Sequence, residues 1–479
     1  MKHLAILCLA VAATCVTAPV ARGQSQLERF ERQLEQIQRD TRLRVDQRIP
    51  AAQRTRFDYG GYLSLQYLSL DDQVGNNHGL RQYDLVGYAH LNLDGVHEFY
   101  GSLRGTYRDF NPGDPFSESE GSGWRGELDR AYYRFDLQRY KAAYAGERID
   151  YNVTLTGGRQ LVYWANGLTL SQVLDAALVD VAYGPLQVQF LAGLTPRRTV
   201  DFDSSRPHFD DNTFRGFYGA LASARVGAHR PFAYALFQQD YNHDYTFDLG
   251  SLVSTRFEYY SYYLGAGSTG TIGDRLLYGV EAVYEGGSTL SNSFDEATFF
   301  PVPQEENQIA ASAADARLDY LFNDVRRTRL SVEAILASGD PDRFNSSNTF
   351  GGNRPGTRDH AFNGFGLLNT GLAFSPSVSN LMAFRVGAST FPLADTRRFD
   401  RLQVGADFFV FNKMREAGGI DERTDTGRYL GVEPDLYLNW QATSDVTLVL
   451  RYGAFFPNGD VIENDDVRQF FYGGLTFAF

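Results

Sequence analysis

Along most of the chain, polar and apolar residues alternate with a period of two. In residues 98–108 the even positions are mainly polar and the odd positions are apolar or glycine, and residues 128–137 and 446–456 repeat the alternation. Because successive side chains of a strand point to opposite faces, each block predicts a β-strand with one polar and one apolar face. The pattern therefore predicts an all-β protein.

The predicted strands are joined by connections of two alternating lengths. Short turns are expected near residues 94–95, 184, 228, 270, 323 and 442. Long polar segments are expected at residues 70–79, 110–125, 196–212, 242–253 and 287–305. Short turns at one end and long loops at the other are typical of a transmembrane antiparallel β-barrel rather than a soluble sandwich.

The strand count follows from the position of the two chain ends. An odd number of alternating blocks would place the ends on opposite sides, and the weakest block, residues 361–375, is rich in glycine and asparagine. Assigning it to a long loop predicts a barrel of about 18 strands over residues 57–479, with 16 or 20 as alternatives. Side chains alone cannot fill a barrel of this size, so we expect an aqueous channel unless loops plug it.

The residues before the barrel predict export. Residues 1–23 have the basic start, apolar run and small-residue cleavage site of a signal peptide. Residues 24–56 are expected to form a periplasmic amphipathic helix and linker, with the helix over residues 25–47. Its short apolar stripe favours a structural segment, an oligomerisation zipper is the alternative, and the helix could contact a periplasmic partner. The stripe consists of Leu27, Phe30, Leu34 and Ile37.

Composition narrows the function. The 479 residues include 58 acids and 45 bases, a net charge of −13, which excludes a nucleic-acid binder that works by bulk charge. The cysteines, Cys8 and Cys15, both lie in the signal peptide, so the exported chain has neither a disulfide nor a cysteine-bound metal. No histidine lies in a hydrolase or metalloprotease motif. We expect no cofactor and no enzyme activity, although an active site assembled from distant loops is the alternative.

Arginine supplies nearly all the positive charge, since the exported chain has only Lys141 and Lys413 as lysines. The planar guanidinium binds carboxylates through two hydrogen bonds, which suits a uronate ligand. Two alternatives remain: a codon bias toward arginine, and ion pairs across the barrel wall, since many acids share the polar face. The candidate solute-binding residues of the lumen are Arg104, Arg108, Arg130, Arg134, Arg159, Arg317, Arg385, Arg451, Glu433 and Asp435, the face of Arg159 being ambiguous beside two glycines.

Three segments resemble the alginate-export family of outer-membrane barrels. They are Gly158-Arg159-Gln160, the run from Tyr429 to Leu436, and the run from Arg451 to Pro457. The resemblance spans roughly residues 57–479 and implies an 18-stranded barrel whose arginine-rich lumen passes an anionic polysaccharide outward. Pro434 departs from a regular strand and predicts a bulge.

We therefore expect a passive channel in the outer membrane of a Gram-negative cell, exporting an alginate-like polysaccharide or passing a related polar solute. Lipid of the outer membrane and the barrel-assembly machinery are the expected partners, because the chain ends in an aromatic strand, at Phe479, that resembles the assembly signal of such barrels. A general or substrate-selective nutrient porin is the first alternative, since the lumen mixes acids and arginines. An adhesin or plugged structural barrel is the second.

Overall fold

A computed structural model describes most of the chain. The described residues are 55–114, 123–197, 199, 201, 213–242, 247–249, 253–295, 300–343, 352–422 and 424–479. The predicted signal peptide and the predicted helix at residues 25–47 lie outside them. No helix in these ranges is long and apolar enough to cross a membrane.

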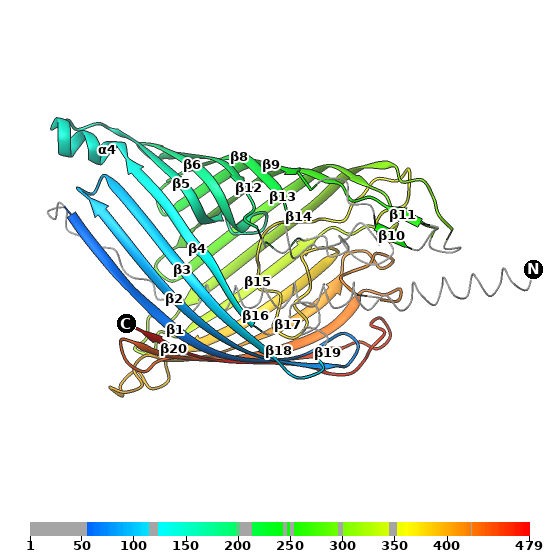
Figure 1. The fold of residues 1–479 in the computed structure, drawn as a ribbon. Coiled ribbons are helices and arrows are strands. Elements are labelled where there is room, and N and C mark those ends of the chain that lie inside the picture. Colours follow the sequence, from blue (N-terminus) through cyan, green and yellow to red (C-terminus); the bar gives the residue numbers. More distant parts are fainter. Residues whose placement is uncertain are drawn as a thin grey trace, which may run out of the picture.

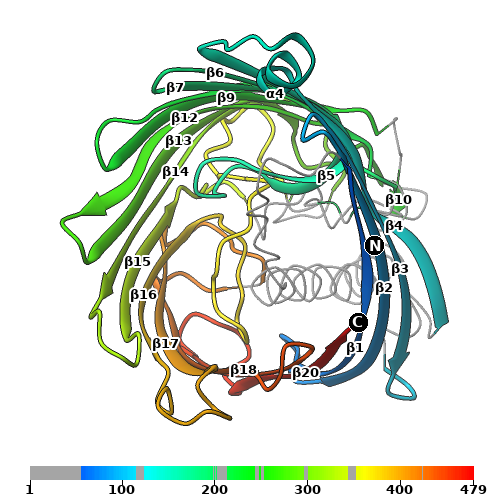
Figure 2. The same cartoon turned by 90° about the vertical axis from the view of Figure 1, so that its left-hand side faces the viewer.

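Eighteen strands form one antiparallel sheet that closes on itself where β1 pairs with β20, which confirms the predicted barrel and strand count (Figures 1 and 2). The barrel strands are β1 (Thr55–Asp71), β2 (Asn77–Leu93), β3 (His97–Phe110), β4 (Gly123–Asp136), β5 (Tyr151–Tyr163), β6 (Ser171–Tyr183), β7 (Leu186–Leu194), β8 (Arg215–Ala224), β9 (His229–Asp240), β12 (Tyr259–Ile272), β13 (Leu276–Leu290), β14 (Glu306–Leu321), β15 (Arg329–Ala337), β16 (Leu381–Thr390), β17 (Leu402–Lys413), β18 (Tyr429–Gln441), β19 (Val446–Pro457) and β20 (Arg468–Ala478). A separate hairpin in one loop pairs β10 (Phe247–Leu249) with β11 (Val253–Thr255).

The connections differ in length between the two ends of the barrel, as predicted. Most turns at one end are short, for example residues 94–96 and 184–185, whereas the longest loop at the other end covers residues 338–380. Two connections at the short-turn end are longer than expected. One is residues 391–401, and the other holds α4 (Leu137–Tyr140) and the π-helix η1 (Lys141–Ala145).

Three details of the predicted layout need correction. The first loop covers only residues 72–76, because the alternating pattern of β1 and β2 continues to its edges. The turn expected near residue 270 lies at residues 273–275. Pro434 pairs in register with Phe408, so the predicted bulge there is wrong, and the register shift lies between Phe411 and Asn412 instead.

The alternation of the sequence becomes the two faces of the wall. On β3, Leu103 points outward and is 65% exposed, whereas Arg104 points into the lumen. Apolar side chains on the outside suit lipid, and polar ones on the inside suit water. A register shift between β3 and β4 leaves Asp129 as an extra residue, so the lumen face of β4 changes from odd to even positions and includes Arg130 and Arg134.

Two segments turn into the barrel interior (Figure 2). One is the tip of the β5–β6 hairpin, residues 164–170, and the other is the part of the β15–β16 loop that follows residue 352, drawn in yellow. They hydrogen-bond to each other: the Phe365 amide donates to the Thr169 carbonyl at 2.9 Å. Apolar side chains of both segments, among them Leu168, Leu170 and Phe362, form one buried cluster with wall residues such as Phe217 of β8 and Leu236 of β9.

Candidate functional site

The inner wall of β3 and β4 carries a row of four arginines at the positions that the sequence predicted. From the long-loop end to the short-turn end they are Arg108, Arg104, Arg130 and Arg134. The first two contact other wall residues: Arg108 Nε donates to Gln82 Oε1 at 3.1 Å, and Arg104 Nη2 lies 2.9 Å from Asp129 Oδ1.

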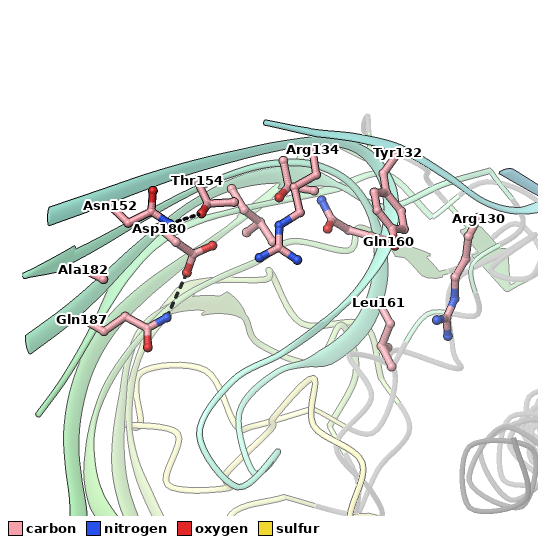
Figure 3. A pocket seen from close by; sticks show the side chains of 12 residues that line it. Arg130, Tyr132, Arg134, Asn152, Thr154, Gln160, Leu161, Asp180, Ala182 and Gln187 are labelled. Carbon is pink, nitrogen blue, oxygen red and sulfur yellow. Dashed lines mark hydrogen bonds between the residues drawn. The ribbon is translucent and has the colours of Figure 1, made fainter. Parts of the chain in front are cut away.

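Arg130 and Arg134 differ from these two, because neither has an ion pair or hydrogen bond with any described residue. Both line a cavity of about 570 Å³ between β4 and β7, which we call the β4–β7 cavity. Figure 3 shows their guanidinium groups projecting from β4 into this space on either side of Tyr132. Two uncompensated cations beside water are suited to attract an anion.

Neutral hydrogen-bonding groups form most of the remaining polar lining of the β4–β7 cavity. They include Asn152, Thr154, Thr156, Gln160 and Gln187, from β5 and β7. Its one acid in the described chain is Asp180, which accepts a hydrogen bond from Gln187 at 3.4 Å (Figure 3). Asp180 also accepts one from Gln189 at 2.9 Å. The cavity can therefore meet a solute that carries both carboxylates and hydroxyls.

The opposite wall holds the other predicted arginines of the lumen. Arg317, Arg385 and Arg451 line a second cavity, of about 480 Å³, bounded by β13–β19. We call it the β13–β19 cavity. Arg317 Nε lies 3.0 Å from Asp319 Oδ2, and Arg385 Nη2 lies 2.5 Å from Glu333 Oε2.

Arg451 also has wall partners. Its Nη1 donates to Asn439 Oδ1 at 2.8 Å, and its guanidinium lies over the ring of Tyr437. These three arginines thus have partners in the wall, in line with the alternative that lumen arginines form structural pairs across the barrel wall. Whether any of them binds a solute stays a prediction.

Arg159 does not face the lumen, so its prediction as a lumen residue is wrong. On β5 the lumen side chains are those of Thr154, Thr156 and Gln160, so Arg159 points outward. It pairs there with Asp175 of β6, with Nε and Oδ1 2.7 Å apart, and its Nη1 donates to the Leu128 carbonyl at 3.1 Å. The sequence could not predict this orientation, because Gly158 has no side chain and the alternation of polar and apolar residues cannot be followed through it.

Glu433 does not line the open channel either. Its carboxylate is 0% exposed and accepts hydrogen bonds from the backbone amides of Leu372, Ala373 and Phe374 at 2.5, 2.6 and 2.8 Å. Asp435, its neighbour on β18, lines the β13–β19 cavity but is only 3% exposed. We therefore assign Glu433 to holding the inner loop rather than to contacting a solute.

Sequence reasoning missed the neutral lining and the inward segments. Tyr132 could have been found, because it shares the lumen face of its strand with Arg130 and Arg134. Residues 164–170 have no alternating pattern and residues 361–375 have only a weak one, so nothing in the sequence indicates that these segments occupy the lumen.

Comparison with known proteins now gives the family and the fold. The model of the alginate-export family matches residues 136–472. No protein of curated function matches the sequence. Among solved structures, Pseudomonas aeruginosa OpdK with vanillate and OccK8 (OprE) each align with a TM-score of 0.51 at 11% identity, covering 88% of this chain and 98% of theirs. At this identity the likeness shows the fold alone, that of outer-membrane porins. The family match covers most of the barrel, and the chain belongs to the alginate-export family of outer-membrane β-barrel channels.

Proposed function

We propose that this outer-membrane channel passes a carboxylate-bearing solute along the β3–β4 wall, and that an alginate-like anionic polysaccharide moving outward is the first candidate. The observation that carries the proposal is the pair of lumen arginines, Arg130 and Arg134, without a carboxylate partner in the described chain. Membership of the alginate-export family supports the polysaccharide.

The spacing of the row suits movement rather than tight binding. A strand rises about 3.3 Å per residue, so Arg130 and Arg134 lie roughly 13 Å apart along β4, and Arg104 and Arg108 are spaced alike on β3. A polyanion can contact successive guanidinium groups in turn, and a single carboxylate is not enclosed by several at once. Neutral amides and hydroxyls between the arginines can bind sugar hydroxyls and exchange them for water.

A substrate-selective nutrient porin is the second candidate. Two segments fold into the lumen and reduce the space through which a polymer would pass. OpdK, whose barrel shares this fold, was solved with vanillate, a small aromatic carboxylate. The arginine row would serve such a solute equally well.

Single-channel recording in a planar bilayer tests both candidates. Oligouronates and vanillate are added in turn to each side of the wild type, the Arg130→Gln/Arg134→Gln variant and, as the control, Arg159→Gln, whose side chain faces outward. Side-dependent block by oligouronates that weakens only in the double variant supports export, and block by vanillate alone supports the porin. Block that is unchanged in the double variant, or absent with both ligands, contradicts an arginine path for carboxylates.

A further inference from the structure

A segment of the β15–β16 loop crosses the lumen and is fixed to the wall at both ends. At one end the Asn363 amide donates to the Glu285 carboxylate of β13 at 2.8 Å. At the other end, Glu433 of β18 accepts the three amide hydrogen bonds described above. We call residues 363–372 the strut. Since β13 and β18 lie five strands apart in the sheet, the strut runs across the interior from one part of the wall to another (Figure 2).

The β5–β6 tip supports the strut near one end. The Phe365 amide donates to the Thr169 carbonyl at 2.9 Å, and the Leu367 amide donates to the Gly167 carbonyl at 3.0 Å. The tip is itself held by Glu281 of β13, which accepts from the Asn166 amide at 2.8 Å. Three glutamates of the inner wall thus bind backbone amides of the two inward segments.

The far half of the strut faces a cavity on one side. Leu368, Asn369 and Leu372 line the β13–β19 cavity, and the two leucines also pack at the edges of apolar clusters of the barrel interior. Beyond Leu372, the ring of Phe374 stacks on that of Phe455, with centroids 4.1 Å apart. This half is therefore attached by apolar packing of Phe374 and the two leucines and by the carboxyl groups of Glu433 and Asp435.

A buried carboxylate is a strong but conditional attachment. Hydrogen bonds to an ionised acceptor are about twice as strong as neutral ones, and a carboxylate without donors is costly inside a protein. The Glu433 side chain has 0% exposure and accepts all three amides, and its neighbour Asp435 also accepts the Leu372 amide. Replacing the Glu433 carboxyl group would weaken its three hydrogen bonds together.

We propose that Glu433 is a positioning residue that fixes the strut between the main lumen and the β13–β19 cavity, and thereby sets the width of the passage. With the strut attached, Leu367, Leu368, Asn369 and Leu372 form one side of the cavity of about 480 Å³. When the strut detaches, the two spaces join and the cross-section for ions increases. The inference concerns ion conductance and does not depend on which solute the channel carries.

The test is Glu433→Gln, recorded as single channels in potassium chloride without added solute. Glutamine keeps one acceptor oxygen but places an amide group opposite the other donor, so the population of the detached state should rise about 10- to 100-fold. We expect a second, larger conductance level that the wild type seldom visits. Glu433→Asp, which keeps a carboxyl group, should spend less time at that level than Glu433→Gln.

Asp84→Asn is the matched control. Asp84 is also a buried lumen carboxylate. It accepts hydrogen bonds from Gln66 Nε2 at 2.8 Å and from Thr106 Oγ1 at 2.7 Å, and both of these partners belong to the wall rather than to the strut. Both substitutions replace a buried lumen carboxyl group by an amide of nearly the same shape, so only Glu433→Gln should add the larger level. Heat-modifiable migration in gels shows that each variant is a folded barrel.

Glu285→Gln releases the other end of the strut and provides an independent variant if Glu433→Gln does not fold. A larger conductance level in either variant, absent from Asp84→Asn, supports the proposal. Unchanged conductance levels and dwell times in the folded Glu433 and Glu285 variants would overturn it. The same new level in Asp84→Asn would also overturn it, because loss of any buried wall carboxylate would then suffice.

Discussion

The assignment of faces on β5 can be tested with one substitution made at two adjacent residues. Leu155 points outward between Phe135 and Val179 of the neighbouring strands and is 43% exposed. Thr154 points inward, lines the β4–β7 cavity, and pairs with Asp136 and Asp180. Leu155→Arg and Thr154→Arg therefore place the same cation on opposite sides of the wall.

The expected magnitudes follow from these positions. Tyr151, at the short-turn end of β5, is an exposed aromatic at the end of the strand, where membrane barrels carry the aromatic girdle of the interface. Leu155 lies four residues further along the strand. With strands tilted by about 40°, this is roughly 10 Å above the interface, near the middle of a lipid-facing band about 25 Å tall. An arginine there costs about 2–4 kcal/mol. Thr154→Arg should change stability by at most about 1 kcal/mol, because the cation meets water and two carboxylates.

The assay is urea unfolding of the purified barrel in lipid vesicles, followed by tryptophan fluorescence. Because every 1.4 kcal/mol is a factor of ten, Leu155→Arg should lower the folding equilibrium constant about 30- to 1,000-fold. A Leu155→Arg barrel as stable as the wild type, or a Thr154→Arg barrel that is equally destabilised, would refute the assignment of faces.

Three further predictions concern other parts of the wall. The Arg130→Gln/Arg134→Gln variant should lower the ratio of anion to cation permeability about 3- to 10-fold, because a charge 4 Å from an ion contributes about 1 kcal/mol in water and salt screens part of it. The reversal potential under a salt gradient measures this ratio, and the control Arg159→Gln should leave it unchanged. Gly158→Ala should prevent stable closure of the β4–β5 seam, because Gly158 has φ +128° and an added Cβ would lie 2.2 Å from a β4 carbonyl oxygen; normal heat-modifiable migration of this variant would contradict the expected clash. Deleting Phe479 should slow barrel assembly, since its backbone forms hydrogen bonds of 2.9 and 3.0 Å with β1; a time course of folding into vesicles tests this, and an unchanged rate would count against it.

The sequence alone determined the barrel and the inward face of most strands. A strand fixes the orientation of every side chain once one is known, so the alternation around Arg104 and Arg134 was enough to place both residues in the lumen. The assignment of residues 361–375 to a loop likewise gave the correct count of 18 strands, because an antiparallel barrel with both ends on one side needs an even number.

Only the tertiary structure decided which lumen charges are free and what fills the interior. Arg159 follows Gly158, where the alternating pattern carries no information about the face, and its outward partner Asp175 lies on another strand. Glu433 resembles any other acid of the polar face until the loop folds back onto it. Such contacts join residues far apart in the chain through loops without periodicity, so the local pattern that predicts strands cannot reveal them.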